Sequence, residues 1–168
     1  IDVGTGSGAV AVTLAANRPG HFYIASDISK KAIIVASQNA NQNSVSNDIF
    51  FFAGMLFEAL SPDVLTFDLI VSNPPYIPTD QIAGLAPEVG KHEPQSALDG
   101  GPEGIDVISK IVEDAPLYLE KNGMLMLEIG YDQKDRLAQI VADDGRYTDL
   151  NFICDYSGHD RVAQMRLK

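Results

Sequence analysis

Short apolar runs rich in β-branched residues alternate with segments of helical period along this chain, and few folds accommodate that alternation. The runs lie at Ile1–Val3, His21–Ser26, Ile49–Ala53, Phe67–Ser72 and Met124–Ile129. Strands that alternate with helices form a mostly parallel, twisted sheet with helices on both of its faces. We therefore predict an α/β fold, and the length of 168 residues suits a single domain over residues 1–168.

Caps and stops place the helices between these strands. A helix over Ala9–Asn17 would end at Pro19, and Ser29 is a suitable N-cap for a helix that reaches about Asn43. Further along, apolar residues recur at helical spacing, at Ile105, Ile108, Ile111, Val112, Ala115 and Leu119. This stripe predicts a helix with one buried face, which Gly123 would close before the next strand.

The last part of the chain follows a different pattern. Asp132 can cap a short helix that Gly145 stops. The runs Asp149–Asp155 and Arg161–Leu167 are joined by a turn that begins at Ser157, so we expect a C-terminal antiparallel pair of strands.

The segment Ile77–Gly104 shows no sustained period. Together with Pro75 just before it, it contains five of the nine prolines. Structureless loops longer than about 12–15 residues are uncommon in compact domains and are usually functional or disordered. Apolar and acidic residues are interleaved here, which favours an ordered lid. Glu93, in this lid, could either help to close a site or be solvated.

The charge and the cysteine content exclude several classes of protein. Twelve basic against 23 acidic residues give a formal net charge of −11, which opposes attraction to phosphate backbones. The lone Cys154 permits no internal disulfide and no Cys/His spacing resembles a zinc site, so we predict a cytoplasmic setting without metal. Cys154 is expected to be a small core residue. The longest apolar stretch, Ala9–Ala16, is far shorter than the roughly 20 residues of a membrane span.

A glycine-rich loop joins the first strand to the first helix and reads Asp-Val-Gly-Thr-Gly-Ser-Gly from Asp2 to Gly8. Glycines let such a loop turn sharply and approach a ligand closely, while the next helix directs its N–H groups at the crevice. The alternation of Gly4, Gly6 and Gly8 differs from the spacing of a dinucleotide fingerprint. A tight turn without a ligand is the alternative interpretation.

Asp27 ends the next strand, 19 residues after Gly8. An acid at this place in a nucleoside-binding α/β fold accepts hydrogen bonds from ribose hydroxyls. A solvated strand end, or a cap for the helix at Ser29, is the competing interpretation. The loop and the acid together predict an adenosine-type cofactor better than either does alone.

The sharpest motif is Asn73-Pro74-Pro75-Tyr76, at the end of an apolar strand. Two successive prolines fix two φ angles and remove two N–H donors, so nearby carbonyls stay free as acceptors. Asn73 adds an acceptor and Tyr76 a flat face. Asn73 Oδ1 and the Pro74 carbonyl would hold both protons of a planar –NH₂ group and direct its nitrogen at an electrophile. The alternative is a turn that merely stops the strand.

At these residues the sequence resembles known families. Asp2 to Gly8 with Asp27 is similar to the cofactor motifs of class I S-adenosylmethionine-dependent methyltransferases, and Asn-Pro-Pro-Tyr to the motif of those that methylate amide or exocyclic amino nitrogens. Further motifs, ordered over nearly the whole chain, resemble the release factor glutamine methyltransferases of the HemK/PrmC family: Glu93-Pro94, Ala97 to Gly101, Gly104-Ile105, Gly123, Glu128 to Gly130, Gln133 and Asp160 to Val162. The resemblance implies a Rossmann-like class I methyltransferase fold.

The resemblance also implies an activity. A methyl group would pass from S-adenosylmethionine to the side-chain amide nitrogen of the Gln in the Gly-Gly-Gln loop of a class I peptide chain release factor, leaving S-adenosylhomocysteine. Carried over residue by residue, the methionine part of the cofactor falls to Gly4, Thr5, Gly6, Ser7 and Gly8. Asp27 takes the ribose, and Asn73, Pro74, Pro75 and Tyr76 take the glutamine, with Asn73 also beside the cofactor.

The adenine contacts depart from the family pattern. Many members have an acid at the position of Met55, where it meets the adenine amino group. Met55 and Leu56 offer only apolar contact to the adenine ring. Affinity for the cofactor would therefore rest more on packing.

Two other functions stay open at this stage. An adenine amino-group methyltransferase acting on DNA or RNA would use the same four residues, although the acidic charge and the lack of a basic, aromatic-interleaved insertion argue against it. A non-catalytic, methyltransferase-like module that binds a protein partner would need a broken site, and only the region of Met55 hints at one.

The family usually carries a small helical domain before the catalytic one, and this chain begins without Met in the tail of a strand. We therefore expect that domain and the start of the first strand to be absent from these residues. The expected partner is a class I release factor, with no direct nucleic acid and no membrane, and the expected state is a monomer.

Overall fold

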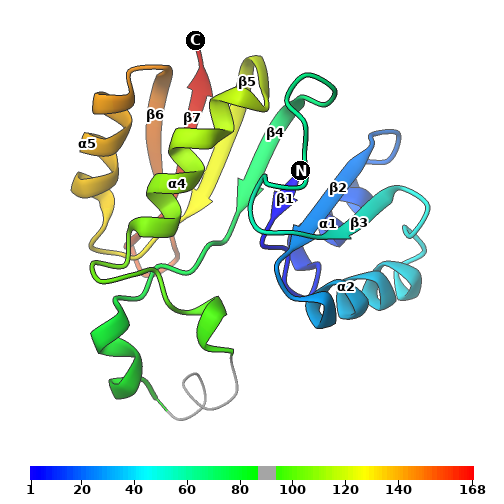
Figure 1. Cartoon of the computed structure of the whole chain (residues 1–168), viewed down its shortest axis with the longest axis horizontal. Coiled ribbons are helices and arrows are strands. Elements are labelled where there is room, and N and C mark those ends of the chain that lie inside the picture. Colours follow the sequence, from blue (N-terminus) through cyan, green and yellow to red (C-terminus); the bar gives the residue numbers. More distant parts are fainter. Residues whose placement is uncertain (87–93) are drawn as a thin grey trace.

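The computed structural model describes residues 1–86 and 94–168, which form an α/β fold around one seven-stranded sheet (Figure 1). The sheet order is β3-β2-β1-β4-β5-β7-β6. The strands are β1 Asp2–Val3, β2 Tyr23–Asp27, β3 Ile49–Ala53, β4 Phe67–Ser72, β5 Leu119–Glu128, β6 Tyr147–Cys154 and β7 Asp160–Leu167. Neighbours from β3 to β5 are parallel, and β7 is antiparallel to both β5 and β6. The predicted mostly parallel sheet with a C-terminal antiparallel pair is confirmed.

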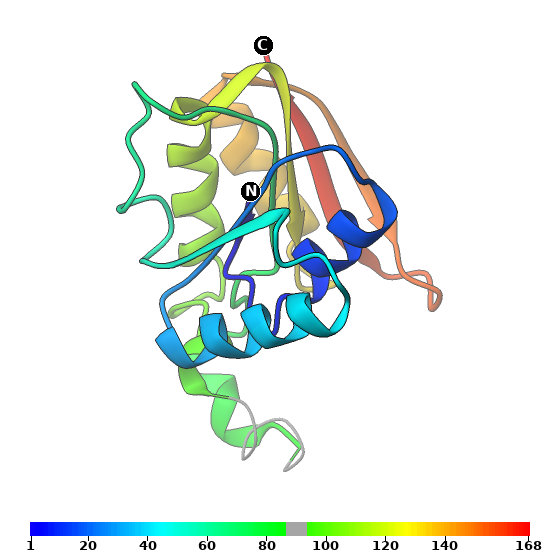
Figure 2. The ribbon, with the colours of Figure 1, turned by 90° about the vertical axis from the view of Figure 1, so that its right-hand side faces the viewer.

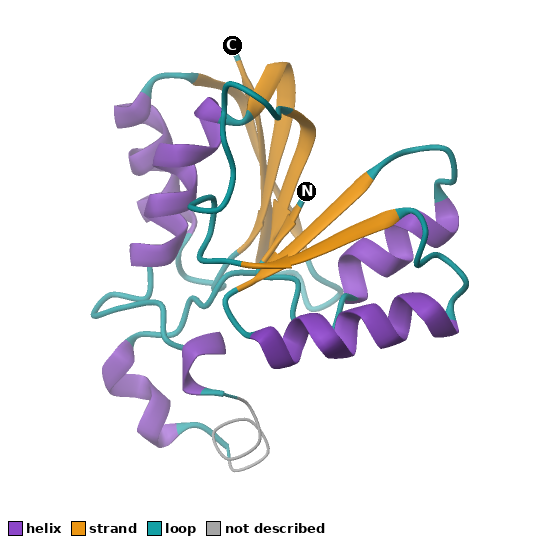
Figure 3. Ribbon diagram, turned by 45° about the vertical axis from the view of Figure 1, so that its right-hand side comes forward, coloured by secondary structure: helices purple, strands orange, loops and turns teal. Residues whose placement is uncertain are grey.

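Helices cover both faces of the sheet (Figure 3). The helices α1 Ala9–Asn17 and α2 Lys30–Gln42 lie on one face, and α4 Asp106–Asp114 and α5 Lys134–Asp144 lie on the other. Strand β2 shows how the two layers are built, because Ile24 packs in the core beneath α4 and α5 while Ala25 packs in the core beneath α1 and α2. Burial on both faces explains why the strands read as continuous apolar runs.

Several predicted helix ends are confirmed. The Ser29 hydroxyl caps α2 by accepting the N–H of Ala32 at 3.3 Å. Gly145 follows α5 with a left-handed φ of 71°, which suits a glycine C-cap. The N-cap of α5 is Gln133, however, and not Asp132.

The predicted stripe helix is too long. It ends at Asp114, the short 3₁₀ helix η3 Ala115–Leu117 follows, and Leu119 already begins β5. Pro116 explains the difference, since a proline lacks the N–H that an α-helix interior needs and its ring clashes with the carbonyl of the preceding turn. Gly123 lies inside β5, at the irregularity in its pairing with β4, and does not close a helix.

The expectation for Cys154 is wrong. Its side chain is exposed at the end of β6, where the Sγ atom lies 3.7 Å from the Oδ1 atom of Asp160. The strand β6 is the edge strand of the sheet, and apart from Tyr147 its side chains are exposed or half-buried.

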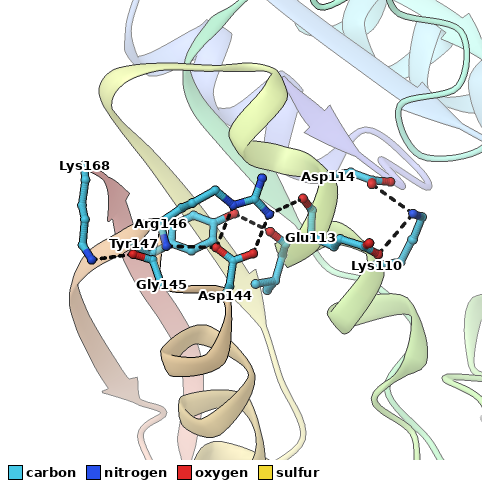
Figure 4. Close-up of polar contacts among 9 residues, drawn as sticks. Lys110, Glu113, Asp114, Asp144, Gly145, Arg146, Tyr147 and Lys168 are labelled. Carbon is cyan, nitrogen blue, oxygen red and sulfur yellow. Dashed lines mark hydrogen bonds and ion pairs between the residues drawn. The ribbon is translucent and has the colours of Figure 1, made fainter.

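The turn between α5 and β6 is fastened to the end of α4 (Figure 4). The Arg146 guanidinium donates to the Glu113 carbonyl at 2.8 Å and forms an ion pair with the Asp144 carboxylate. The hydroxyl of the buried Tyr147 donates to the Val112 carbonyl at 2.7 Å. These contacts fix the antiparallel C-terminal strands on the helical layer.

The segment Ile77–Gly104, called the excursion below, leaves the sheet after β4 and returns before α4. It contains the 3₁₀ helices η1 Thr79–Gly84 and η2 Gln95–Ala97, and Figures 1 and 2 show its described residues, 77–86 and 94–104, extending away from the sheet (green). Glu93 lies outside the described residues.

No described helix is long and apolar enough to cross a membrane.

Candidate active site

The carboxyl ends of three adjacent parallel strands place the sequence motifs together. In the register of the sheet, Val3 of β1 pairs with Ser26 of β2 on one side and with Ser72 of β4 on the other. The residues that follow these three are Gly4, Asp27 and Asn73. The chain order reverses at β1, and ligands of open α/β sheets bind at such a switch point. The structure therefore brings the predicted loop, acid and acceptor motif to one edge.

The alternating glycines of the loop are required by its backbone. Gly4, Gly6 and Gly8 have φ angles of 73°, 57° and 83°, in the left-handed region that glycine adopts without strain. A Cβ atom on Gly8 would lie 3.0 Å from the Cβ of Ala36, so this glycine also permits the close packing of α1 on α2. A Cβ on Gly6 would meet no atom of residues 1–86 and 94–168 within 4 Å, which leaves open space above the middle of the loop.

The buried Asp2 carboxylate braces the loop from within. Its Oδ2 atom accepts the Thr5 hydroxyl at 2.6 Å and the Ala11 N–H at 3.1 Å. Burial raises the pKa of Asp2, and these two hydrogen bonds partly offset the shift. The Thr5 side chain, predicted to contact a cofactor, is therefore used inside the protein. The Ser7 carbonyl is likewise held, by the Asn39 amide at 2.8 Å.

Asp27 connects the glycine loop to the two adjacent strand ends. One carboxylate oxygen accepts the Gly6 N–H at 2.9 Å and the other accepts the Ser29 N–H at 2.8 Å. Its backbone carbonyl accepts the Gly54 N–H at 3.0 Å, just after β3. The carboxylate is only partly buried, and each of its oxygens has a further lone pair for an outside donor.

Two apolar side chains stand exposed beside this acid. Met55 follows β3 and is 50% exposed, so it is free to make the predicted apolar contact, whereas Leu56 packs partly against the main core. Ile28, directly after Asp27, is 61% exposed, and it was missed in the sequence. The sequence did contain a signal for an exposed apolar contact at Ile28, because this large apolar residue lies between the strand that ends at Asp27 and the helix that Ser29 caps.

The Asn73–Tyr76 motif presents unpaired acceptors. Asn73 is exposed, and within the described part of the chain neither its side chain nor the Pro74 carbonyl forms a hydrogen bond. The Tyr76 hydroxyl donates to Glu128 Oε1 at 3.3 Å, which joins the end of β4 to the end of β5. Burial raises the pKa of Tyr76 above its ordinary value of 10, and the Glu128 carboxylate raises it further, so the phenol is neutral. Glu128 was part of a family motif in the sequence but had no assigned role.

A cavity of about 420 Å³ lies elsewhere, at the amino ends of the strands, where Leu14, Tyr23 and Phe67 are among its lining residues. Of the three motifs, only Asp2 lines this cavity, so concavity alone would misplace the site. Among residues 1–86 and 94–168, no group of His, Cys, Asp and Glu could hold a metal ion.

Comparison with known proteins decides the family. Residues 1–87, just over half of the chain, match the family model described as the methyltransferase small domain. The chain belongs to this family. Curated relatives of this methyltransferase small domain include the release factor glutamine methyltransferase of Gloeobacter violaceus, 41% identical over 97% of this chain and 56% of the relative. That of Geobacter sulfurreducens is 41% identical over 99% of this chain and 57% of the relative. The chain thus spans about half the length of the curated relatives it matches.

Solved structures confirm the class I methyltransferase fold of this family member. A ribosomal protein L11 methylase from Lactobacillus delbrueckii subsp. bulgaricus matches with a TM-score of 0.71 and 21% identity, over 99% of this chain and 68% of that chain. An RNA methyltransferase from Salinibacter ruber, in complex with S-adenosyl-L-homocysteine, matches with a TM-score of 0.59 and 17% identity, over 99% of this chain and 78% of that chain. At these identities the likeness shows the fold alone.

Proposed function

We propose that this chain is the catalytic domain of an S-adenosylmethionine-dependent enzyme that methylates the Gln side chain in the Gly-Gly-Gln loop of class I peptide chain release factors. One observation carries the proposal: the acceptors at Asn73 and Pro74, which have no partner among the described residues, lie on the same sheet edge as the glycine loop and Asp27. The curated relatives named release factor glutamine methyltransferase support this choice of substrate.

The residues at this edge fit the cofactor. Open space above Gly6 leaves room for the methionine part, and Asp27 retains lone pairs for two ribose hydroxyls. The exposed side chains of Ile28 and Met55, after adjacent strands, would pack against the adenine ring. When bound, S-adenosylmethionine supplies an electrophilic methyl group.

The acceptor motif compensates for a poor nucleophile, since the lone pair of an amide nitrogen is delocalised into its carbonyl. Asn73 Oδ1 and the Pro74 carbonyl accept the two N–H groups of the substrate amide, and Tyr76 offers its ring as a flat support. Fixing this orientation lowers the barrier because the reacting nitrogen no longer has to be aligned from solution. Tyr76 is neutral and hydrogen-bonded to Glu128, so the motif lacks a strong base, and the amide proton leaves after methyl transfer.

The setting follows from this substrate. Release factors act on ribosomes, so the proposed location is the cytoplasm. We also propose that the active form is a monomer that meets the factor directly. The net charge of −11 suits attraction to basic surfaces of such a factor, and it disfavours nucleic acid as a direct substrate.

The test has two stages. Calorimetry with S-adenosylhomocysteine first measures cofactor binding. Methyl transfer from labelled S-adenosylmethionine is then compared for a class I release factor, for the same factor with the Gln of Gly-Gly-Gln replaced by Asn, and for an adenine-containing oligonucleotide. We expect label only on the unaltered factor. Label on the oligonucleotide with none on the factor would make the chain an adenine methyltransferase, and binding without any transfer would make it a non-catalytic module.

A further inference from the structure

The side chain of Gln133 is buried and its hydrogen-bonding capacity is largely used. It is 7% exposed, and its Nε2 atom donates to the Tyr76 carbonyl at 3.0 Å and to the Gly104 carbonyl at 2.8 Å. Its Oε1 atom accepts the Gly130 N–H at 2.9 Å. Both amide protons and one oxygen lone pair therefore have protein partners. A buried amide this fully engaged fixes the relative position of the groups that it contacts.

The two carbonyls that Gln133 holds are the two ends of the excursion. Tyr76 directly precedes it, and Gly104 is its last residue. Inside these ends the two arms pair as a stem, through three backbone hydrogen bonds: Ile77 N–H to Leu98 O at 3.0 Å, Gly100 N–H to Ile77 O at 2.9 Å and Thr79 N–H to Gly101 O at 3.0 Å. Beyond the stem, none of the residues 80–86 and 94–97 is buried. The base of the excursion thus depends on the stem and on Gln133.

The Tyr76 carbonyl is confined from a second side. Gly104 has a φ angle of 69°, and a Cβ atom there would lie 2.5 Å from the Tyr76 oxygen. This oxygen is therefore enclosed between the Gly104 backbone and the Gln133 amide. Because Pro74 and Pro75 have restricted φ angles, a displacement of Tyr76 is passed on to the Asn73 and Pro74 acceptors.

We propose that Gln133 is a positioning residue for methyl transfer, which sets the geometry of the Asn73–Tyr76 acceptor motif by holding both ends of the excursion on one side chain. This inference rests on the proposed function of that motif. Loss of the two Nε2 hydrogen bonds should lower kcat by about 10- to 100-fold, since a displacement of roughly 1 Å at a reacting group costs about 100-fold in rate. The KM for S-adenosylmethionine should stay within about twofold, because Gln133 contacts neither the glycine loop nor Asp27.

The experiment compares Gln133→Met, which keeps the shape of the side chain, with Gln139→Met as the matched control. Gln139 lies on α5, the helix whose N-cap residue is Gln133, and its exposed side chain bonds only to Asp143 among the described residues. We expect a lower kcat with unchanged cofactor KM for Gln133→Met, and no change in either for Gln139→Met. The Gln133→Asn variant retains donors on a shorter side chain and should have an intermediate kcat. A Gln133→Met enzyme with the wild-type kcat, or one whose cofactor KM rises in proportion, would overturn the proposal.

Hydrogen exchange separates this proposal from the proposed function. The amides of Ile77, Thr79 and Gly100 donate the stem hydrogen bonds, and they should exchange at least tenfold faster in Gln133→Met, while the amides of α2 are unchanged. If the wild-type protein bound cofactor but never methylated a release factor, the proposed function would fail, and the exchange result would still test whether Gln133 holds the two ends of the excursion. Unaltered exchange at the three stem amides would show that Gln133 does not hold the excursion.

Discussion

The carboxylate of Asp27 accepts the N–H of Gly6 at 2.9 Å, so the acid that ends β2 orders the glycine loop that follows β1. Its second oxygen accepts the N–H of Ser29 at the start of α2. The sequence offered a ribose ligand and a helix-end role as competing interpretations of this residue. The structure shows a helix-end contact that leaves lone pairs on both oxygens, so the two roles are compatible.

Replacing Asp27 by Asn should weaken S-adenosylhomocysteine binding by about 10- to 100-fold, because a hydrogen bond to a charged group contributes roughly 1.5–3 kcal/mol. The carbonyl oxygen of Asn can still accept one of the two loop N–H groups, so folding should be largely retained. Calorimetry measures the dissociation constant, and Asp63→Asn, on an exposed loop, is the matched control. An unchanged dissociation constant for Asp27→Asn would remove Asp27 from the cofactor site.

Alanine substitutions at three glycines with positive φ angles distinguish the stability cost of backbone strain from a loss of cofactor affinity. Ala at Gly6 or at Gly20 meets no neighbour, so each change should cost about 1–2 kcal/mol of stability from the left-handed backbone alone. Only Gly6→Ala should also lose cofactor affinity, by tenfold or more, because its Cβ enters the space above the loop. Gly8→Ala should cost about 2–4 kcal/mol, since its Cβ also presses on Ala36. Urea unfolding and calorimetry check both quantities, and equal affinities for Gly6→Ala and Gly20→Ala would contradict the assignment.

Asn73→Ala should abolish methyl transfer to the release factor, with kcat lowered by at least about 100-fold. Binding of S-adenosylhomocysteine should change little. The control is Asn47→Ala, for which full activity is expected. Asn47 is exposed and precedes β3, near the amino ends of the parallel strands and away from the candidate site. Single-turnover transfer at saturating cofactor measures the chemical step. An Asn73→Ala enzyme that still methylated the factor would refute the acceptor role.

The Asp144–Arg146 pair gives a pH-dependent contribution to stability. The hydrogen bond from Arg146 lowers the pKa of Asp144 below its ordinary value of 3.8. A lowered folded-state pKa means that the stabilisation is complete above the ordinary pKa and is lost as the pH falls through the lower folded value. Asp144→Asn should therefore reduce the free energy of unfolding at pH 7 by about 0.5–1 kcal/mol, since Arg146 is partly exposed and screened.

Urea unfolding at pH 7 and near pH 2.5 checks this expectation. The difference between the wild-type protein and Asp144→Asn should shrink at the lower pH. Asp143→Asn removes the same charge from the adjacent, exposed position and serves as the control. A difference independent of pH would show that the ion pair is not its source.

Local chemistry made much of the fold predictable. Ser29 as a cap, Gly145 as a stop and the doubly buried run of β2 each depend on neighbours in the sequence, so their patterns are visible without the tertiary structure. The errors arose where local signals conflict. The apolar spacing through Leu119 favours a helix, but Pro116 interrupts it and leaves Leu119 to begin β5. Cys154 was misplaced because an apolar run does not reveal which strand lies at the edge.

The motifs of the site could be predicted from the sequence, but the hydrogen bonds that join them to distant residues could not. Asp27 and Asn73 stand at strand ends in the sequence, and the parallel sheet brings such ends together. The pairing of Tyr76 with Glu128 joins residues 52 positions apart, and the contact of Gln133 with Tyr76 joins residues 57 apart. A single sequence contains no signal for these distances, because they depend on how β5 and the start of α5 pack against the end of β4.

Both ends of the excursion are held by the Gln133 side chain, and this affects how the length of the excursion can vary between related domains. Once the two arms are joined at their base, lengthening the chain between them adds little entropic cost, about 0.6 kcal/mol for each doubling of loop length. None of the described residues beyond the stem contributes to the buried core. The excursion is therefore a natural exchange point, where one segment can be replaced by another of different length while the residues at the sheet edge keep their positions.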